Sequence, residues 1–321
     1  MIATPAFLDG SRPDVPDLVV TQGVTPFYLD NQPVRGRLVR PGVLTDALLS
    51  RHDNPYVISA LAGKALALVG GLASALKFQG SFSLQIRGDG PVSMVVADCT
   101  DDGALRFYVR HDEEELEQLL GEITSPTDRD LVGSGYMALT VDQGPETERH
   151  QGIVEITGDD LAEMAMHYFE TSEQHSVFIR LASAMTDSGW RTGGLIMEKI
   201  AAEGGVVAEH ITGETSPEGD EAWETALMLA RTLTGAELLD DNLSSSALLY
   251  RLFHEQELCL GHDRALAYGC RCSRARLAGV LGGFSEDDLD HMTECDTITM
   301  TCEFCNVSFR FDRDEISTAR G

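Results

Sequence analysis

Two pairs of cysteines near the end of the sequence have the residue type and spacing of a metal site. One residue separates Cys270 from Cys272, two separate Cys302 from Cys305, and 29 lie between the pairs. Zinc prefers tetrahedral coordination by thiolates, and two close pairs brought together by a small fold supply four of them. We therefore predict that these four side chains bind one zinc ion per chain in the reduced protein.

The other three cysteines carry weaker signals. Cys99 ends a strand-like run and is predicted to be a small core residue. Cys259 and Cys295 lie near the metal unit in the sequence, and we interpret them as incidental thiols. The alternative for these two is a spare target for oxidants.

Other chemical motifs are incomplete. Gly133-Ser134-Gly135 lacks the third glycine of a dinucleotide loop, and Gly63-Lys64-Ala65 lacks the flanking residues of a phosphate loop. The segment from His254 to Leu258 lacks the second histidine of a zinc protease helix. No Ser-His-Asp or paired-carboxylate signature is evident. The sequence therefore predicts no enzyme and no catalytic residue.

The charge of the chain limits its partners. Its 321 residues include 52 Asp and Glu against 24 Lys and Arg, a formal net charge of −28. Such a surface repels phosphate backbones and anionic lipids, so we expect neither nucleic acid nor a membrane as partner. The start of the chain lacks the basic region and apolar run of a secretory signal. We expect a cytoplasmic protein, where cysteine pairs more often indicate metal or redox chemistry than structural disulfides.

The elements that must position the cysteines belong to an α+β fold. Strand-like runs mixed with helical patterns indicate a sheet-and-helix domain rather than a doubly wound sheet. The expected strands are Val34 to Val39, Phe82 to Ile86, Val92 to Val96, Leu105 to Val109, Tyr136 to Val141 and Gly152 to Ile156. The expected helices are Thr45 to Arg51, Val57 to Lys77, Glu113 to Leu120 and Asp159 to Ser172. The apolar part of the second helix, Leu61 to Leu76, is interpreted as buried core rather than a membrane span.

Four regions follow from the composition. We expect a mobile N-terminal extension over residues 1–24, an α+β core domain over 25–212, an acidic helical linker over 213–264 and a zinc-binding domain over 265–321. The linker is predicted to contain helices over Glu221 to Thr234, Gly235 to Leu239 and Ser244 to Cys259. Its apolar positions need a surface to cover them. In the last region, strand-like runs over Thr297 to Thr301 and Asn306 to Phe311 flank the second cysteine pair.

Several short motifs match one known family. They are Val34-Arg35-Gly36, Gly88-Asp89-Gly90-Pro91, Leu131-Val132-Gly133-Ser134-Gly135-Tyr136, Gln151-Gly152-Ile153-Val154, Leu249-Tyr250-Arg251-Leu252-Phe253-His254-Glu255, and the cysteine motifs Cys270-Arg271-Cys272 and Cys302-Glu303-Phe304-Cys305. With these, the chain from about Phe27 to Gly321 resembles the 33-kDa heat shock protein family of redox-regulated holdase chaperones. The N-terminal extension and the additional Cys259 and Cys295 depart from the family pattern.

The resemblance implies a chaperone of oxidative and heat stress that is inactive while reduced and zinc-loaded. Oxidants would release zinc, pair Cys270 with Cys272 and Cys302 with Cys305, and unfold the zinc domain and the linker. The exposed apolar surface would then bind unfolding client proteins without ATP, and the active form would tend to form a homodimer.

Elementary energetics agrees with such a switch. A unit of about fifty residues has too little core to be stable alone. Structural zinc contributes on the order of 10–16 kcal/mol of apparent binding free energy, comparable to the stability of a whole domain. Two alternatives remain open from the residues themselves. One is a static zinc ribbon that binds nucleic acid or protein, and the other is a thiol-disulfide oxidoreductase that uses Cys302 and Cys305.

Overall fold

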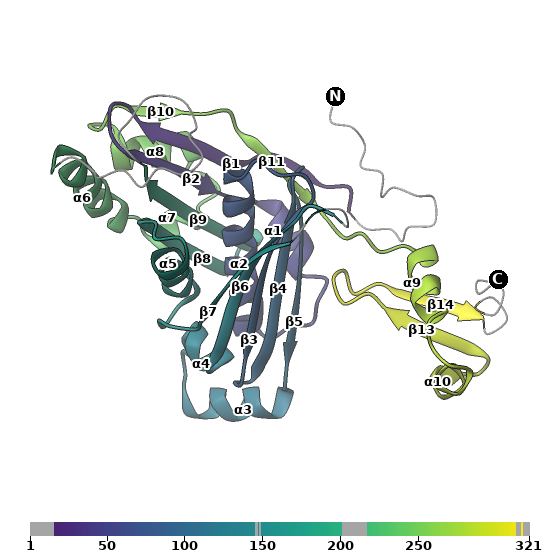
Figure 1. The fold of residues 1–321 in the computed structure, drawn as a ribbon. Helices are drawn as coiled ribbons and strands as arrows, with labels where there is room; N and C mark the ends of the chain where they lie inside the picture. The colour runs from purple at the N-terminus through teal and green to yellow at the C-terminus, as the bar shows by residue number, and fades with distance from the viewer. Residues whose placement is uncertain (1–15, 145–146, 148, 201–216, 313–315, 317–321) are drawn as a thin grey trace. The chain divides into compact units, whose positions relative to one another are not determined.

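A computed structural model describes residues 16–144, 147, 149–200, 217–312 and 316 of the chain (Figure 1). The described residues form a mixture of strands and helices, which confirms the expected α+β class. The chain divides into two compact units, a large one over residues 18–268 and a small one that contains residues 1–17 and 269–321. The residues of the predicted mobile extension from 1 to 15 lie outside the description.

One long mixed sheet is the framework of the large unit. Its strands are β1 (Val19–Leu29), β2 (Val34–Val39), β3 (Ser81–Gly88), β4 (Val92–Thr100), β5 (Ala104–His111), β6 (Gly135–Asp142), β7 (His150–Glu155), β8 (Val177–Thr186), β9 (Gly189–Lys199), β10 (Leu258–Leu260) and β11 (Arg264–Tyr268). The order is β7-β6-β3-β4-β5-β11-β1-β2-β9-β8, and β10 pairs with β1. Two antiparallel halves meet at the parallel pair of β5 and β11, where Ala104 lies opposite Ala267 and Leu105 opposite Tyr268.

The helices of the large unit are α1 (Val43–Leu49), α2 (Tyr56–Ala75), α3 (Glu113–Glu122), α4 (Asp128–Val132), α5 (Leu161–Ser172), α6 (Pro217–Arg231), α7 (Gly235–Leu239) and α8 (Ser245–Phe253). Several begin at a side chain that caps the first turn. Asp112 accepts a hydrogen bond from the Glu115 amide at 3.0 Å, and Asp160 accepts one from the Glu163 amide at 2.9 Å. Such caps satisfy amides that have no partner within the helix.

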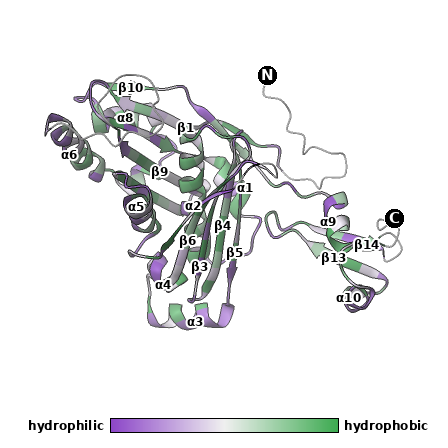
Figure 2. Ribbon diagram, viewed as in Figure 1, coloured by the Kyte–Doolittle hydropathy of each residue, from purple (hydrophilic) through white to green (hydrophobic). Residues whose placement is uncertain are grey.

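Helix α2 is the apolar centre of the large unit. By length and composition it could cross a membrane, but 78% of its most apolar window is buried inside the fold. It packs against both halves of the sheet, and Figure 2 shows its hydrophobic residues. A Cβ at Gly71 would lie 2.5 Å from Ile196 Cδ1, so glycine permits the close approach of α2 to β9. The interpretation of this segment as a core helix is confirmed.

Helices α6, α7 and α8 cover the opposite face of β1, β2 and β9. Phe27, Leu38 and Met197 of the strands form one buried cluster with Trp223 of α6 and Phe253 of α8. The rings of Phe27 and Phe253 are stacked with their centroids 5.4 Å apart. The apolar positions of the predicted linker therefore have the covering surface that they require. We define residues 217–257 as the connector.

Two predicted boundaries differ from the structure. Strand β1 begins at Val19, inside the expected extension over residues 1–24, because its first residues pair with β11. The boundary expected at residue 265 falls inside β11, because that strand completes the large sheet between β1 and β5. The last residues of the predicted linker are thus part of the core sheet.

The small unit contains α9 (Arg274–Leu281), α10 (Glu286–Met292) and a sheet of β12 (Thr293–Glu294), β13 (Thr297–Thr301) and β14 (Ser308–Asp312). The strand order is β12-β13-β14, with Thr301 opposite Ser308 at the end of the second hairpin. This hairpin agrees with the strands predicted on either side of Cys302 and Cys305.

Candidate metal centre

The first cysteine pair lies between β11 and α9. Cys270 and Cys272 are both buried, although they lie outside any strand or helix. Ser273 follows and caps α9, because its Oγ accepts a hydrogen bond from the Arg276 amide at 3.2 Å. The side chain of Arg276 in turn donates to the Arg271 carbonyl at 3.3 Å. These contacts fix the backbone that carries the two thiols.

The second pair lies in the turn that joins β13 to β14. The Cys302 amide donates to the Val307 carbonyl at 2.9 Å, and the Asn306 amide donates to the Cys302 carbonyl at 2.8 Å. Asn306 has a φ of 54°, a left-handed conformation that asparagine tolerates better than most residues. The turn brings both sulfurs to one side, as the predicted pair of strands requires.

The four sulfurs form one cluster. All four Sγ atoms lie within 4.8 Å of one another. Separations of 3.4 Å between Cys270 and Cys272, 3.7 Å between Cys270 and Cys302, and 3.4 Å between Cys272 and Cys305 are found. A tetrahedron of thiolates about 2.3 Å from a zinc ion has edges of about 3.8 Å. The donor set and its spacing therefore fit a tetrahedral metal ion.

Hydrogen bonds among the thiols divide the cluster into easily and poorly ionised members. The hydrogen bond with Cys272 lowers the pKa of Cys270 to about 7. Hydrogen bonds with Cys270, and then with Cys272 and Cys305, lower the pKa of Cys302 far below its usual value. Hydrogen bonds with Cys270 and then Cys302 raise the pKa of Cys272, and those with Cys270, Cys272 and Cys302 raise the pKa of Cys305. Hydrogen bonds from neighbouring thiols thus stabilise thiolate within the cluster, and thiolate is the form that binds metal.

Little apolar surface supports this cluster. The buried hydrophobic residues of the described small unit, apart from the cysteines, are Leu281, Leu289, Ile298, Phe309, Phe311 and Ile316. The guanidinium of Arg274 lies 4.6 Å from the centroid of the Phe311 ring, a cation–π contact. A core of this size needs a further source of stability, and a bound metal would provide it.

Comparison with known proteins identifies the chain. The family model described as "Hsp33 protein" matches residues 22–312. This chain belongs to the Hsp33 family. The 33 kDa chaperonin of Caulobacter vibrioides is 38% identical over 299 residues, which cover 92% of this chain and 96% of that protein. The 33 kDa chaperonin of Photorhabdus laumondii is 31% identical over 296 residues, with 92% and 94% covered.

The fold agrees with this Hsp33 assignment. The crystal structure of the 33 kDa chaperonin from Thermotoga maritima superposes with a TM-score of 0.74, covering 93% of this chain and 98% of that one at 20% identity. The resemblance inferred from the motifs is therefore confirmed, as is the α+β fold with a cysteine cluster near its C-terminal end.

The remaining cysteines lie apart from the cluster. Cys99 is buried in β4, as expected for a core residue. Cys259 is half-buried in β10 opposite Tyr28, and Cys295 is exposed in the turn after β12.

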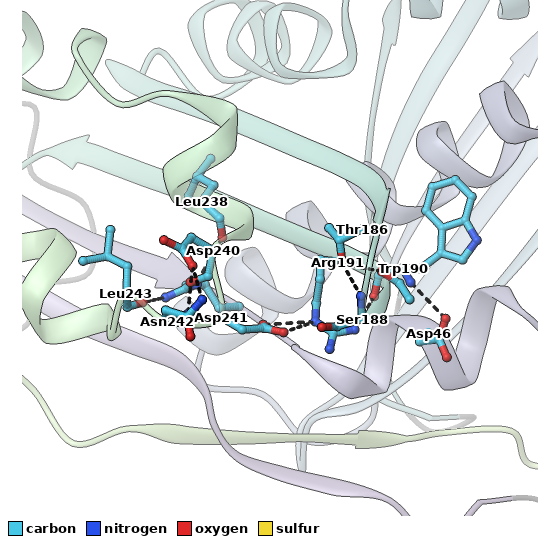
Figure 3. A network of polar contacts seen from close by, with 12 residues as sticks. Asp46, Thr186, Ser188, Trp190, Arg191, Leu238, Asp240, Asp241, Asn242 and Leu243 are labelled. Carbon is cyan, nitrogen blue, oxygen red and sulfur yellow. Dashed lines mark hydrogen bonds and ion pairs between the residues drawn. The ribbon is translucent and has the colours of Figure 1, made fainter.

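Sequence reasoning missed two arginines that contact the connector. Arg40 follows β2 and bonds to the end of α7 and the residues after it. Arg191 lies in β9 and bonds to Asp241, between α7 and α8 (Figure 3). No local pattern marks these residues, because their partners lie 50 or more positions away in the sequence.

Proposed function

We propose that this protein is an ATP-independent holdase chaperone that oxidation of a zinc-bound four-cysteine site activates. Membership of the Hsp33 family and the relatives named 33 kDa chaperonin support a chaperone function. The four clustered sulfurs are the observation that carries the switch. The assignment of Cys270, Cys272, Cys302 and Cys305 as both zinc ligands and redox switch is our proposal.

In the reduced state the four thiolates would bind zinc, and the metal would supply the folding free energy that the small core lacks. Each disulfide forms when a pair of thiolates loses two electrons, and hydrogen peroxide that accepts these electrons and two protons from solvent becomes two waters. A disulfide sulfur no longer carries the negative charge that makes thiolate a strong ligand. Oxidation would therefore abolish the metal site and leave the small unit without its main source of stability.

The disulfides of the oxidised form are proposed to join Cys270 to Cys272 and Cys302 to Cys305. The distances do not select this pairing, because Cys272 and Cys305 are as close as Cys270 and Cys272. The Cys270–Cys272 and Cys302–Cys305 disulfides each close a very short loop. Neither therefore adds much stability by lowering the entropy of the unfolded chain. Peptide mapping of the oxidised protein distinguishes the proposed pairing from one in which Cys272 is joined to Cys305.

The surface that binds clients is proposed to be the face of β1, β2 and β9 beneath the connector. Phe27, Leu38 and Met197 on this face are almost fully buried by connector residues such as Trp223 and Phe253. Release of the connector would expose a continuous apolar area, the kind of surface that marks protein interaction sites. We further propose that the protein has no catalytic group and that it acts in the cytoplasm. Its partners would be unfolded proteins, and its active form would be a homodimer.

A comparison of reduced and oxidised protein tests this function. We expect about one zinc per chain and no suppression of aggregation in the reduced sample, and zinc release with strong suppression after peroxide treatment. The measurements are elemental analysis and light scattering of a thermally unfolding client, without nucleotide. A zinc-loaded protein whose activity does not respond to oxidation would instead support the static zinc ribbon. Turnover of a disulfide substrate would support the oxidoreductase.

A further inference from the structure

Arg40 binds the connector entirely through backbone carbonyls. Its Nε donates to the Leu238 carbonyl at 3.0 Å, and its Nη1 and Nη2 donate to the carbonyls of Leu243 and Asp240. Every nitrogen of the guanidinium therefore faces a peptide oxygen. These acceptors are present in any polypeptide, so the contact has no requirement for particular side chains.

Arg191 provides a second contact of a different kind. Its Nε lies 3.0 and 2.8 Å from the two carboxylate oxygens of Asp241 (Figure 3). Its Nη1 donates to the Trp190 carbonyl at 3.0 Å, so its own strand helps to orient the side chain. The side chain of Arg191 is 6% exposed and that of Asp241 is 47% exposed. The arginine thus belongs to the core surface, and the carboxylate reaches it from the solvent side.

An apolar position adjoins these two arginines. Leu238 is 1% exposed and belongs to the same buried cluster as Leu195 of β9. A Cβ at Gly193 would lie 3.0 Å from the Leu238 carbonyl, so this glycine lets the chain approach the sheet closely. The segment of residues 238–243 therefore presents a leucine, three backbone carbonyls and a carboxylate to one small area of the large unit.

We propose that Arg40 and Arg191 form a client-binding subsite, and that the segment of residues 238–243 occupies it as an internal substitute for a client. The inference rests on the proposed function, because the connector must leave before the subsite is free. The occupant is a segment of an unfolded protein with a leucine, followed by a turn that offers backbone carbonyls to Arg40 and an acidic side chain to Arg191. Unfolded chains offer such carbonyls, whereas native proteins satisfy nearly all of theirs when buried.

The chemistry of the two arginines favours recapture of a similar chain. Both side chains lose these connector partners when residues 238–243 leave, and a partly buried cation without a partner is costly. A client carbonyl turn and carboxylate restore the bonds to Arg40 and Arg191. Lysine cannot replace Arg40, because an ammonium lacks the planar fork that reaches three separate oxygens. The subsite therefore gives the otherwise apolar client surface a preference for acidic segments.

The test uses the full-length oxidised protein and a fluorescent peptide with the sequence of residues 234–245. Fluorescence anisotropy should show that the peptide binds the oxidised wild type and not the reduced, zinc-loaded form, in which the connector occupies the site. Arg40→Lys and Arg191→Asp should each weaken binding to the oxidised protein by about tenfold or more, as expected for charged hydrogen bonds. Arg180→Asp, an equal charge change at an exposed position of β8, is the matched control and should not alter binding.

A charge exchange separates direct contact from a structural role. The peptide with Asp241→Lys should bind the wild type weakly and the Arg191→Asp protein about as well as the original pair. Equal weakening of both peptides by Arg191→Asp would overturn the subsite. So would an oxidised wild type that suppresses aggregation without binding the peptide, and in that case the proposed function would still stand. Failure of the oxidised wild type to suppress aggregation would refute the function itself.

Discussion

The large and the small unit reach a folded state by different means. The large unit buries α2 within its sheet and has a second apolar cluster under the connector. The small unit buries few hydrophobic side chains and places four thiols among them. The stability of the large unit is spread over many contacts, whereas that of the small unit is concentrated in one site. The difference teaches that a single chemical event can remove the fold of the small unit and leave that of the large one.

The largest expected effect is the loss of the small unit when two ligands are removed. Cys302→Ser combined with Cys305→Ser should abolish zinc binding, whose apparent free energy is on the order of 10–16 kcal/mol. Hydrogen exchange followed by mass spectrometry should show that β13 and β14 exchange like an unfolded chain, while β3 and β4 stay protected. If β13 and β14 remained protected in the zinc-free variant, the small unit would have a sufficient core and the comparison would fail.

The same variant separates metal loss from disulfide formation. We expect appreciable suppression of aggregation under reducing conditions, because the proposed function assigns activation to loss of the metal site and this variant loses that site without any oxidant. A zinc-free variant with a disordered small unit and no activity would show that the disulfides act directly.

The next effect concerns the connector. Phe253 is fully buried and stacks on Phe27, so Phe253→Ala should cost about 3–5 kcal/mol in local stability. We expect partial holdase activity in the reduced protein while zinc remains bound. Tyr250→Ala is the matched control, because Tyr250 lies on the same helix and is 64% exposed. A Phe253→Ala protein that is destabilised but inactive without oxidant would place the client surface elsewhere.

A smaller effect is expected at a polar cluster on β2 and β9. Burial alone would raise the pKa of Glu198, but hydrogen bonds from His175 and Arg35 and the charges of Arg37 and Arg35 lower it well below its usual range. A carboxyl with a depressed folded-state pKa adds stability above its unfolded-state pKa of about 4.3, and this contribution is lost as the pH falls toward the folded-state value. The cluster therefore stabilises the large unit at neutral pH.

Glu198→Gln should lower the free energy of unfolding of the large unit by about 1–3 kcal/mol at pH 7. The difference from the wild type should shrink as the pH is lowered below about 4. Urea denaturation can be followed by the fluorescence of Trp190 and Trp223, both of which lie in the large unit. A difference that is constant with pH would mean that Glu198 contributes by packing rather than by charge.

The smallest effect is expected at Cys99. This side chain is 1% exposed in β4, and Cys99→Ala should cost about 1 kcal/mol by leaving a small cavity. Zinc content and the response to oxidant should not change. Impaired oxidative activation of this variant would mean that Cys99 takes part in the switch, contrary to its position in the core.

The sequence predicted several of the elements whose signals are local. The helix expected over Val57 to Lys77 is α2, and the strands expected beside the second cysteine pair are β13 and β14. The cysteine pairs could be recognised because their spacing reflects the geometry of a metal ion. Each of these signals lies within about twenty neighbouring residues, where apolar period and turn chemistry are informative.

Elements that depend on distant partners were not found. The predicted helix over Ser244 to Cys259 ends at Phe253, because the backbone of Glu257 has a φ of 50° and Leu258–Leu260 pairs with β1. Strand β10 has only three residues, and β11 is defined by its pairing with β1 and β5 rather than by a local partner. Their pairing spans most of the chain, as the hydrogen bond between Gln22 and Asp263, 241 positions apart in the sequence, illustrates.

The position of β11 has a consequence for biosynthesis. This strand is the last of the large sheet to leave the ribosome, yet it lies between β1 and β5, which are made early. Until β11 is made, β1 and β5 each lack the strand that pairs with them at this point of the sheet. Open strand edges readily pair with other chains, and proteins emerge from the ribosome at only about 5–20 residues per second. The nascent protein is therefore, for most of its own synthesis, an incompletely folded chain of the kind that we propose the finished protein binds.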